Sequence, residues 1–217
     1  MPREHREELT KERILDAAEV LFAQKGYRAV SVREITSAAR CNLAAVNYHF
    51  GTKKNLYLEV FRSRWVPRAT RIRDSFRKAL AGQDTLSPPL VVRALAQAFV
   101  EGPLSDEVRL RHSQLMIREM TQPTKAFEFV AQEVIQPFFK EFADKLGSAQ
   151  IDKVDQEQML LNIFSIFSMV LYFNFARVAV SSLTGREYDT AFRARLVEQI
   201  TQFSLKGLDV NEMEGQG

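Results

Sequence analysis

The feature that most constrains this chain is a pair of helix starts that lie close together, at Ser31 and Asn42. Ser31 is followed three positions later by Glu34, a pattern in which each side chain bonds the other residue's free backbone N–H group. Asn42 is a favoured residue before the first turn of a helix, so a second helix should run from about Leu43 to His49. The two short helices must therefore cross at a steep angle.

Apolar residues beside each start support this arrangement. Val30 and Ile35 bracket the first start, and Cys41 and Val46 bracket the second, as hydrophobic staples do. Cys41 is interpreted as packing against Val46 in preference to redox chemistry, because the chain holds one cysteine and a lone thiol has no partner. Two steeply crossed short helices form a helix-turn-helix, whose second helix enters the major groove of DNA. The sequence thus predicts a DNA-reading segment over residues 31–54.

The charge distribution agrees with this prediction. Residues 1–80 carry 17 Lys and Arg against 9 Asp and Glu, a net +8, whereas residues 81–217 carry 13 against 18, a net −5. One end of the chain is therefore suited to a polyanion and the other is not. The chain is 46% hydrophobic and 26% charged, which is typical of a globular protein. Residues 1–12 are charged throughout and resemble no signal peptide, so a cytoplasmic location is expected.

The remainder reads as helix, since no alternating apolar and polar run is long enough for a sheet. We expect an all-α chain of about nine helices. Pro67 should bend or split the fourth helix at Val66, and Pro137 should kink the seventh. The expected helices span about 10–26, 31–39, 43–49, 52–80, 89–101, 105–121, 124–146, 155–182 and 189–206.

These elements suggest a division of the chain. Residues 1–52 would form a three-helix DNA-binding domain, and residues 53–81 a connecting helix with a kink or break near 67. A turn-rich stretch from Gly82 to Pro89 then opens a larger ligand-binding and dimerisation domain, residues 82–210. Residues 211–217 would be a frayed tail.

Two segments carry a family resemblance. Ile35-Thr-Ser-Ala-Ala39 through Asn47-Tyr-His-Phe-Gly-Thr-Lys53 resembles the DNA-binding region of TetR/AcrR-type transcriptional regulators, over about residues 9–64. Arg118-Glu-Met-x-x-Pro-Thr-x-Ala-Phe-Glu128 resembles the C-terminal domain of the CecR-like branch. The resemblance implies a homodimer on a palindromic double-stranded DNA operator, with a small effector bound in the helical body. Family members are usually repressors, and no cofactor is expected.

Positions in the reading helix can be assigned by geometry. Val46 and Phe50 are one turn apart and must face inward. The residues left toward DNA are Ala44, Ala45, Asn47 and Tyr48. The family commonly has Gly, Thr and Tyr at the positions of Ala44, Ala45 and Asn47, so the operator cannot be inherited from it. Asn47 could make a bidentate contact with adenine, which contributes ~1–3 kcal/mol of discrimination.

Other polar residues are expected to cap helices at the interface or to hold phosphates. Arg33 could instead reach a base, and His49 could be a packed or capping histidine. Lys53 and Lys54 oppose the dipole of their own helix, which is reasonable if a phosphate is their partner, although exposed lysines can also serve solubility alone. Tyr48, although it faces DNA, is expected to hold a phosphate, as are Arg33, His49, Thr52 and Lys53. The predicted DNA-binding residues besides Ala44, Ala45, Asn47 and Tyr48 are Ser31, Arg33, Asn42, His49, Thr52, Lys53 and Lys54.

The body holds 12 of the 16 phenylalanines, which could form an effector pocket or a filled core. Residues 158–176 contain no charge and are long enough to suggest a membrane span. A polar stripe argues against insertion in lipid: Gln158, Asn162, Ser165, Ser168 and Tyr172. We expect no membrane contact, and we expect the last two long helices to pair with their copies across a two-fold axis, which would cover their apolar faces.

An effector pocket is expected between the fifth and eighth helices, although each candidate could equally be packing. Glu119 could pair instead with Arg118 or Arg177. The candidates are Phe99, Leu115, Glu119, Met120, Phe138, Phe164 and Ser168.

Three other kinds of function are less consistent with the sequence. An enzyme has little support, because no nucleophile, base and orienting residue cluster in a motif and no Gly-rich phosphate loop occurs. A metal site is not expected either, since His5, His49 and His112 are far apart in sequence. A DNA-coating or DNA-bending protein without an effector would bind all sequences alike. An operator-binding protein should prefer its palindrome by at least ~10³-fold.

Overall fold

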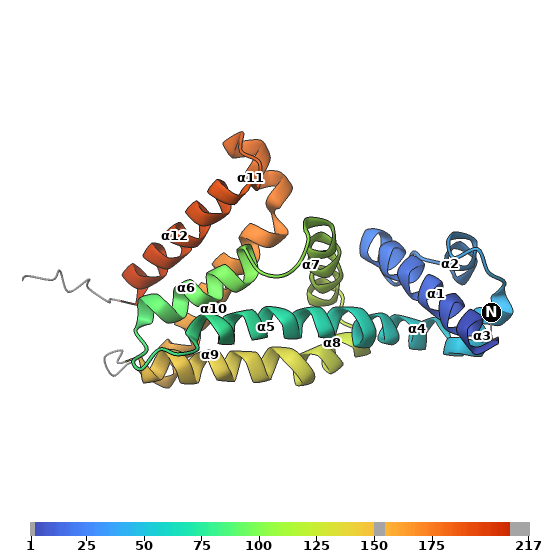
Figure 1. The fold of residues 1–217 in the computed structure, drawn as a ribbon, viewed down its shortest axis with the longest axis horizontal. Helices are drawn as coiled ribbons and strands as arrows, with labels where there is room; N and C mark the ends of the chain where they lie inside the picture. Colours follow the sequence, from blue (N-terminus) through green and yellow to red (C-terminus); the bar gives the residue numbers. More distant parts are fainter. Residues whose placement is uncertain (1–2, 150–154, 209–217) are drawn as a thin grey trace, which may run out of the picture. The chain divides into compact units, whose positions relative to one another are not determined.

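The computed structural model describes residues 3–149 and 155–208, which are helical with no strand (Figure 1), so the expected all-α class is confirmed. The expected tail, 211–217, lies outside the described residues. The elements are α1 (Arg3–Lys25), α2 (Val32–Ala38), α3 (Leu43–Phe50), α4 (Lys53–Val60), the π-helical turn η1 (Phe61–Trp65), α5 (Val66–Leu80), α6 (Pro88–Val100), α7 (Asp106–Thr121), α8 (Lys125–Val130), the π-helical turn η2 (Ala131–Ile135), α9 (Gln136–Ser148), α10 (Gln156–Phe175), α11 (Arg177–Thr184) and α12 (Thr190–Gly207).

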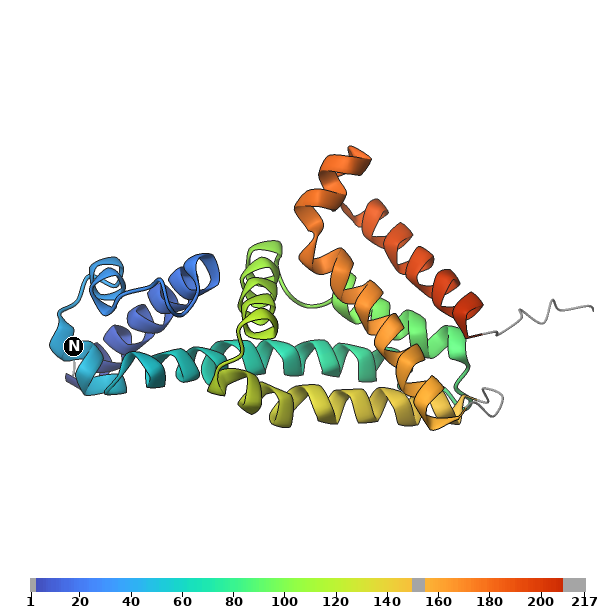
Figure 2. The ribbon, with the colours of Figure 1, turned by 180° about the vertical axis from the view of Figure 1, so that it is seen from behind.

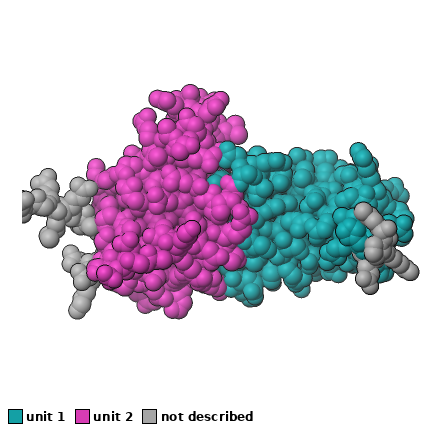
Figure 3. Space-filling view, in the orientation of Figure 1, with its two compact units in different colours: residues 1–69, 105–134 teal, residues 70–104, 135–217 magenta. Residues whose placement is uncertain are grey.

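Packing groups these elements into two compact units (Figure 3). Unit 1 is Met1–Ala69 with Ser105–Val134, and unit 2 is Thr70–Leu104 with Ile135–Gly217. Helices α7 and α8 therefore pack with the N-terminal helices, although they follow α6 in the chain. The sequence analysis places its domain boundaries after residues 52 and 81, and that division stays a prediction.

Unit 1 is built around α1, which packs against α2, α3, α4 and α7. Its apolar side chains Ile14, Ala18 and Phe22 are fully buried and form the centre of this unit. The start of α1 differs from the expectation: the helix begins at Arg3, and the Thr10 hydroxyl donates back to the Arg6 carbonyl within it. Thr10 is therefore not a cap. Good helix formers precede it, and they extend the helix by about two turns.

Unit 2 is built around α6, which packs against α12, α10 and α9 (Figure 2). Aromatic rings fill its interior: Phe138 makes edge contacts with Phe76 at 5.5 Å and with Phe167 at 5.8 Å between ring centroids. Arg73 and Arg77 both bond the Glu141 carboxylate, at 2.6 Å each. Burial acts to raise the pKa of Glu141, but these two guanidinium partners hold it below its usual value. Part of the phenylalanine content is thus plain core.

Two prolines explain two irregular turns. Pro67 follows η1 by two residues, and Pro137 follows η2 by two residues. A proline lacks the N–H group and its ring collides with the carbonyl four residues back, so a local widening of the helix relieves both problems. In η1 the Val66 N–H accordingly bonds the Phe61 carbonyl, five residues back. π-Helical turns thus lie just before both prolines, where the sequence predicts a bend or a break.

The expected helix over 155–182 is wrong in one respect. The helix breaks at Ala176, which is not helical and separates α10 from α11. The Asn174 side chain donates to the Val170 carbonyl at 2.9 Å, and the Tyr188 hydroxyl donates to the Phe173 carbonyl at 2.7 Å. Both hydrogen bonds are accepted by backbone carbonyl groups in the last turns of α10. By length and composition, α10 is also the one helix of the described residues that could cross a membrane.

Candidate nucleic-acid interface

Helix α2 begins with the reciprocal cap expected from the sequence. The Ser31 N–H donates to the Glu34 carboxylate at 2.7 Å, and the Glu34 N–H donates to the Ser31 hydroxyl at 3.2 Å. Lys25, at the end of α1, bonds the same carboxylate at 2.9 Å. The hydrogen bond from Lys25, followed by those from Ser31, lowers the pKa of Glu34 to about 2. The start of α2 is thereby fixed to the end of α1.

The turn between α2 and α3 is short and sharply bent. Arg40 has a positive φ of 50°, a left-handed conformation that a single residue can adopt in such a turn. The Cys41 N–H donates to the Thr36 carbonyl at 3.0 Å, which closes the turn. Cys41 is half-buried, and burial raises the pKa of its thiol. A raised pKa favours the unreactive thiol, in keeping with the packing interpretation.

Helix α3 has a buried face and an exposed face. Its cap is Asn42, whose side-chain oxygen accepts from the Ala45 N–H at 2.9 Å. Val46 and Phe50 are buried, as predicted, while Ala44, Asn47 and Tyr48 are exposed, Tyr48 by 72%. Ala45 and His49 are half-buried. Of the four predicted reading residues, three are therefore exposed and Ala45 is half-buried.

The two lysines at the start of α4 differ in their exposure and contacts. Thr52 caps the helix, because its hydroxyl accepts from the Asn55 N–H at 3.1 Å. Lys54 is exposed, whereas the Lys53 ammonium lies 4.5 Å from the centre of the Tyr27 ring. Burial lowers the pKa of Lys53. A cation over an aromatic face is attracted to the ring, so the Tyr27 ring holds the Lys53 ammonium in one position.

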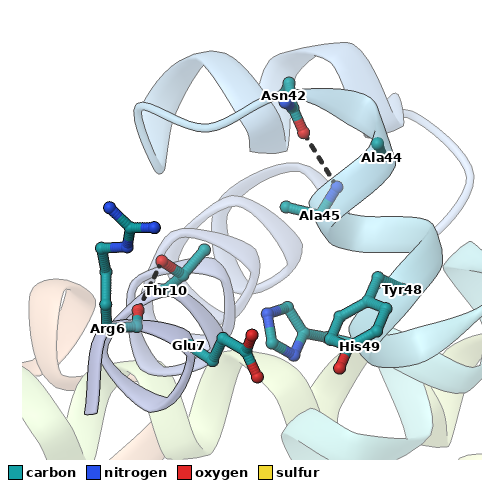
Figure 4. Close-up of a pocket in the computed structure, with 8 residues that line it drawn as sticks. All are labelled: Arg6, Glu7, Thr10, Asn42, Ala44, Ala45, Tyr48 and His49. Carbon is teal, nitrogen blue, oxygen red and sulfur yellow. Dashed lines mark hydrogen bonds between the residues drawn. The ribbon is translucent and has the colours of Figure 1, made fainter. Parts of the chain in front are cut away.

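A hollow of about 400 Å³ lies between α1 and α3. Figure 4 shows its walls: Arg6 and Glu7 on one side, and Ala45, Tyr48 and His49 on the other. Its full lining is Arg6, Glu7, Thr10, Asn42, Ala44, Ala45, Tyr48 and His49. The residues of α1 were missed in the sequence. Helix α1 carries five Lys and Arg against six Asp and Glu, so no excess of positive charge pointed to them.

Arg33 and Ser31 complete the predicted set. Both are exposed, and Arg33 follows the Ser31 cap by two residues, in the first turn of α2. Among the described residues Arg33 makes no ion pair, so its guanidinium is available to a phosphate or a base. Unit 1 thus holds a capped short helix with an exposed face, flanked by basic residues on α2 and α4.

Family models match both parts of the chain. The model described as "Bacterial regulatory proteins, tetR family" matches residues 14–60. The model for the C-terminal domain of the HTH-type transcriptional dual regulator CecR matches residues 90–208, more than half of the chain. The chain is a TetR-family transcriptional regulator of the CecR type. The regulator therefore acts by binding DNA, and the resemblance stated from its sequence is confirmed.

Relatives agree with this assignment. The regulator is 27% identical over 205 residues to the HTH-type transcriptional dual regulator CecR of Shigella flexneri, which covers 90% of this chain and 87% of that one. Its fold is similar to the crystal structure of a TetR-like transcriptional regulator from Rhodococcus sp. RHA1, with a TM-score of 0.68, 17% identity and coverage of 97% and 100%. A mutant of HlyIIR gives a TM-score of 0.64, 23% identity and coverage of 90% and 95%.

The CecR-like segment at the end of α7 connects elements of unit 1. The Arg118 guanidinium donates to the Ala23 carbonyl at 2.9 Å and to that of Gln24, at the end of α1. Gly26 has a φ of +85°, and a Cβ there would lie 3.2 Å from the Arg118 guanidinium. Arg118 therefore satisfies helix-end carbonyls that would otherwise lack partners.

Glu119 has partners other than those expected. Its buried carboxylate accepts from the Tyr57 hydroxyl at 2.6 Å, from the Thr124 N–H at 2.9 Å and from the Phe127 N–H at 3.0 Å. These partners differ from the alternative pairing with Arg118 or Arg177, because a helix N-terminus offers a carboxylate several free donors. Glu119 thus caps α8.

The seven effector candidates divide between the units. Leu115 and Glu119 are buried in α7 of unit 1, and Met120 beside them is 55% exposed. In unit 2, Phe99 and Phe138 stack with ring centroids 6.1 Å apart. Phe164 and Ser168 lie on the exposed side of α10, where the Ser168 hydroxyl donates to the Phe164 carbonyl. As an effector pocket, the set stays a prediction.

Proposed function

We propose that this regulator is a homodimeric repressor that binds a palindromic operator and releases it when a small hydrophobic or aromatic effector binds the helical body. The observation that carries operator binding is the exposed face of α3, where Ala44, Asn47 and Tyr48 stand beside one another above a buried face. Helix α3 can enter a major groove, since its cap uses its own backbone and leaves this face free of internal partners.

Exposed apolar side chains support the homodimer. On α11, Val178 is 80% exposed and Leu183 is 86% exposed. The neighbouring helices add Leu160, Leu161, Phe164, Tyr172 and Phe203. A monomer rarely leaves so many large apolar groups in water, and a second copy would cover them across a two-fold axis. The polar stripe of α10 lies on the same exposed side: Ser165 donates to the carbonyl of Leu161, and Gln158 donates to Asn162.

Aromatic rings in unit 2 support a hydrophobic or aromatic effector. Phe139 stacks on Phe167 with ring centroids 4.1 Å apart, and Phe138 contacts the same ring. Such rings can accept an aromatic compound among them if they move apart. In the dimer, the two DNA-binding parts, or heads, must be spaced to fit two half-sites. An effector lowers operator affinity only if it binds more tightly to a conformation with another head spacing than to the DNA-bound conformation.

The test begins by selecting DNA bound by the full chain from a random library. We expect one palindrome, preferred over random DNA by at least ~10³-fold. The selected site is then placed between a promoter and a reporter, where expression should fall when the regulator is present. The Shigella relative is named a dual regulator, so a rise in expression would replace repression by activation. Equal binding of all sequences would contradict the proposal and favour a coating protein.

The effector is tested separately, with the full chain bound to the selected operator. A panel of small aromatic and aliphatic compounds is added, and operator affinity and the melting temperature of the free protein are measured together. An effector should raise the melting temperature and weaken operator binding. If no compound in a broad panel changes either quantity, the sensing part of the proposal fails while operator binding stands.

A further inference from the structure

Helix α3, the proposed DNA-reading helix, forms one wall of the hollow between α1 and α3. Ala44 and Tyr48 belong both to the exposed face of α3 and to the lining of the hollow. A partner that contacts this face therefore also comes within reach of the first turns of α1. We propose that this hollow receives one sugar-phosphate strand of the operator, and that Arg6 binds a phosphate of that strand.

This inference rests on the proposed operator binding and extends it to a second side of α3. An α-helix with its side chains is about 10–12 Å across, and the major groove is about 12 Å wide. A helix in the groove therefore has a DNA backbone along each side. Thr52 and Lys54 stand at the end of α3 that leads into α4, while Ala45 and His49 face α1.

Small side chains keep the hollow open. Ala44 and Ala45 add only methyl groups to its wall, and the side chain of Asn42 is turned to its own helix by the bond to the Ala45 N–H. Figure 4 shows that space is left between these residues and α1. A strand can thus enter without displacing a large side chain.

Arg6 has the chemistry for a phosphate. It is exposed, and within the described part of the chain it makes no ion pair. The Thr10 hydroxyl donates to the Arg6 carbonyl at 2.9 Å, so the backbone at Arg6 is held in a regular turn. A guanidinium offers two parallel N–H groups that fit two phosphate oxygens.

A carboxylate in the same hollow restricts where the phosphate can bind. Figure 4 shows the Glu7 side chain directed toward His49, while the Arg6 guanidinium lies on the other side, away from His49. Negative charge near Glu7 repels a phosphate, and positive charge at Arg6 attracts it. The strand is therefore held at the Arg6 end, and Arg6 sets the position of the head on DNA as well as adding affinity.

The experiment compares the full chain with Arg6→Ala, Arg6→Lys and Lys145→Ala on the operator selected by the wild type. Lys145 is an exposed cation on α9 and serves as a control for net charge. Affinity is measured over a range of salt concentrations, and ethylation interference maps the phosphates that each variant needs. Circular dichroism checks that each variant is folded.

We expect Arg6→Ala to reduce the slope of log affinity against log salt by about one unit for each head. It should also lose sensitivity to ethylation at one phosphate in each half-site, while Arg6→Lys keeps most of the slope. An unchanged slope and footprint would overturn the inference, as would an equal effect of Lys145→Ala. Failure of the wild type to select any operator is a different result, which would overturn the proposed function itself.

Discussion

The Tyr57 hydroxyl donates a 2.6 Å hydrogen bond to the buried carboxylate of Glu119, a residue 62 positions later in the chain. Tyr57 lies on α4, directly after the reading helix, and Glu119 lies near the end of α7, where it also caps α8. Burial, and then the bond to Glu119, raise the pKa of Tyr57. A single carboxylate therefore joins the helix that follows the reading segment to two helices of the CecR-like part.

This bond can be tested with Tyr57→Phe, which removes one hydroxyl and leaves the ring contacts with Phe22 and Phe61 in place. A hydrogen bond to a charged group contributes about 1.5–3 kcal/mol, so the free energy of unfolding should fall by that amount. Urea unfolding followed by tryptophan fluorescence measures it. Tyr27→Phe is the matched control, because Tyr27 packs on the same ring and should lose less.

Stability of unit 1 should depend on pH through His112. Its ring stacks on Trp65 at 4.4 Å between centroids, and among the described residues its buried Nδ1 atom has no hydrogen-bond partner. Burial, followed by the nearby Arg68 and Arg109, lowers its pKa to about 3 from an ordinary 6.5. Above pH 6.5 both folded and unfolded chains hold a neutral ring. Between pH 6.5 and 3 only the unfolded chain binds the proton, so stability falls as pH falls.

The measurement is urea unfolding at pH values from 7 to 5.5, which stay above the ordinary carboxylate pKa values of about 4. Trp65 is the single tryptophan of the chain, so its fluorescence reports on this site. Each pH unit should cost about 1.4 kcal/mol from this one group. His112→Phe should flatten the dependence and His49→Gln should not. An equally steep dependence in His112→Phe would remove His112 as the cause.

Local signals predicted much of this fold. The caps Ser31 and Asn42 and the irregular turns near Pro67 and Pro137 followed from short-range chemistry, because a cap or a proline acts within a few residues. The Tyr57 to Glu119 bond could not be predicted, since its partners are distant in sequence and the carboxylate had several plausible partners. The proposed role of Arg6 could not be predicted for a similar reason, because the packing of α1 beside α3 is a tertiary contact.

The two lysines at the start of α4 should differ in their contribution to DNA binding. Lys53→Ala is expected to weaken binding to all DNA and to lower the salt slope by about one unit for each head. Tyr27→Leu should produce part of the same loss with no change of charge, because it removes the ring that holds the Lys53 ammonium. Lys54→Ala should lower the slope by less, and Lys145→Ala, on α9, is the charge control. Equal slopes for wild type and Lys53→Ala would exclude Lys53 from the phosphate contacts.

Asn47 should read a base. It is exposed on α3, on the side away from the hollow, and an amide can bond adenine at two atoms. Asn47→Ala should relax the preference at one position of each half-site, with a loss of about 1–3 kcal/mol on the preferred base. Repeating the selection with the variant measures this. A uniform loss over all sequences would assign Asn47 to the backbone contacts instead.

The spacing of half-sites tests most directly whether this regulator reads DNA as a symmetric pair of heads. Wild-type affinity is measured on the selected palindrome and on versions in which about five base pairs, half a helical turn, are inserted at its centre. The account predicts that the insertion lowers affinity by about 10²-fold or more, since the second head then faces the wrong side of the duplex. Unchanged affinity across all spacings would contradict a dimer that reads two half-sites together.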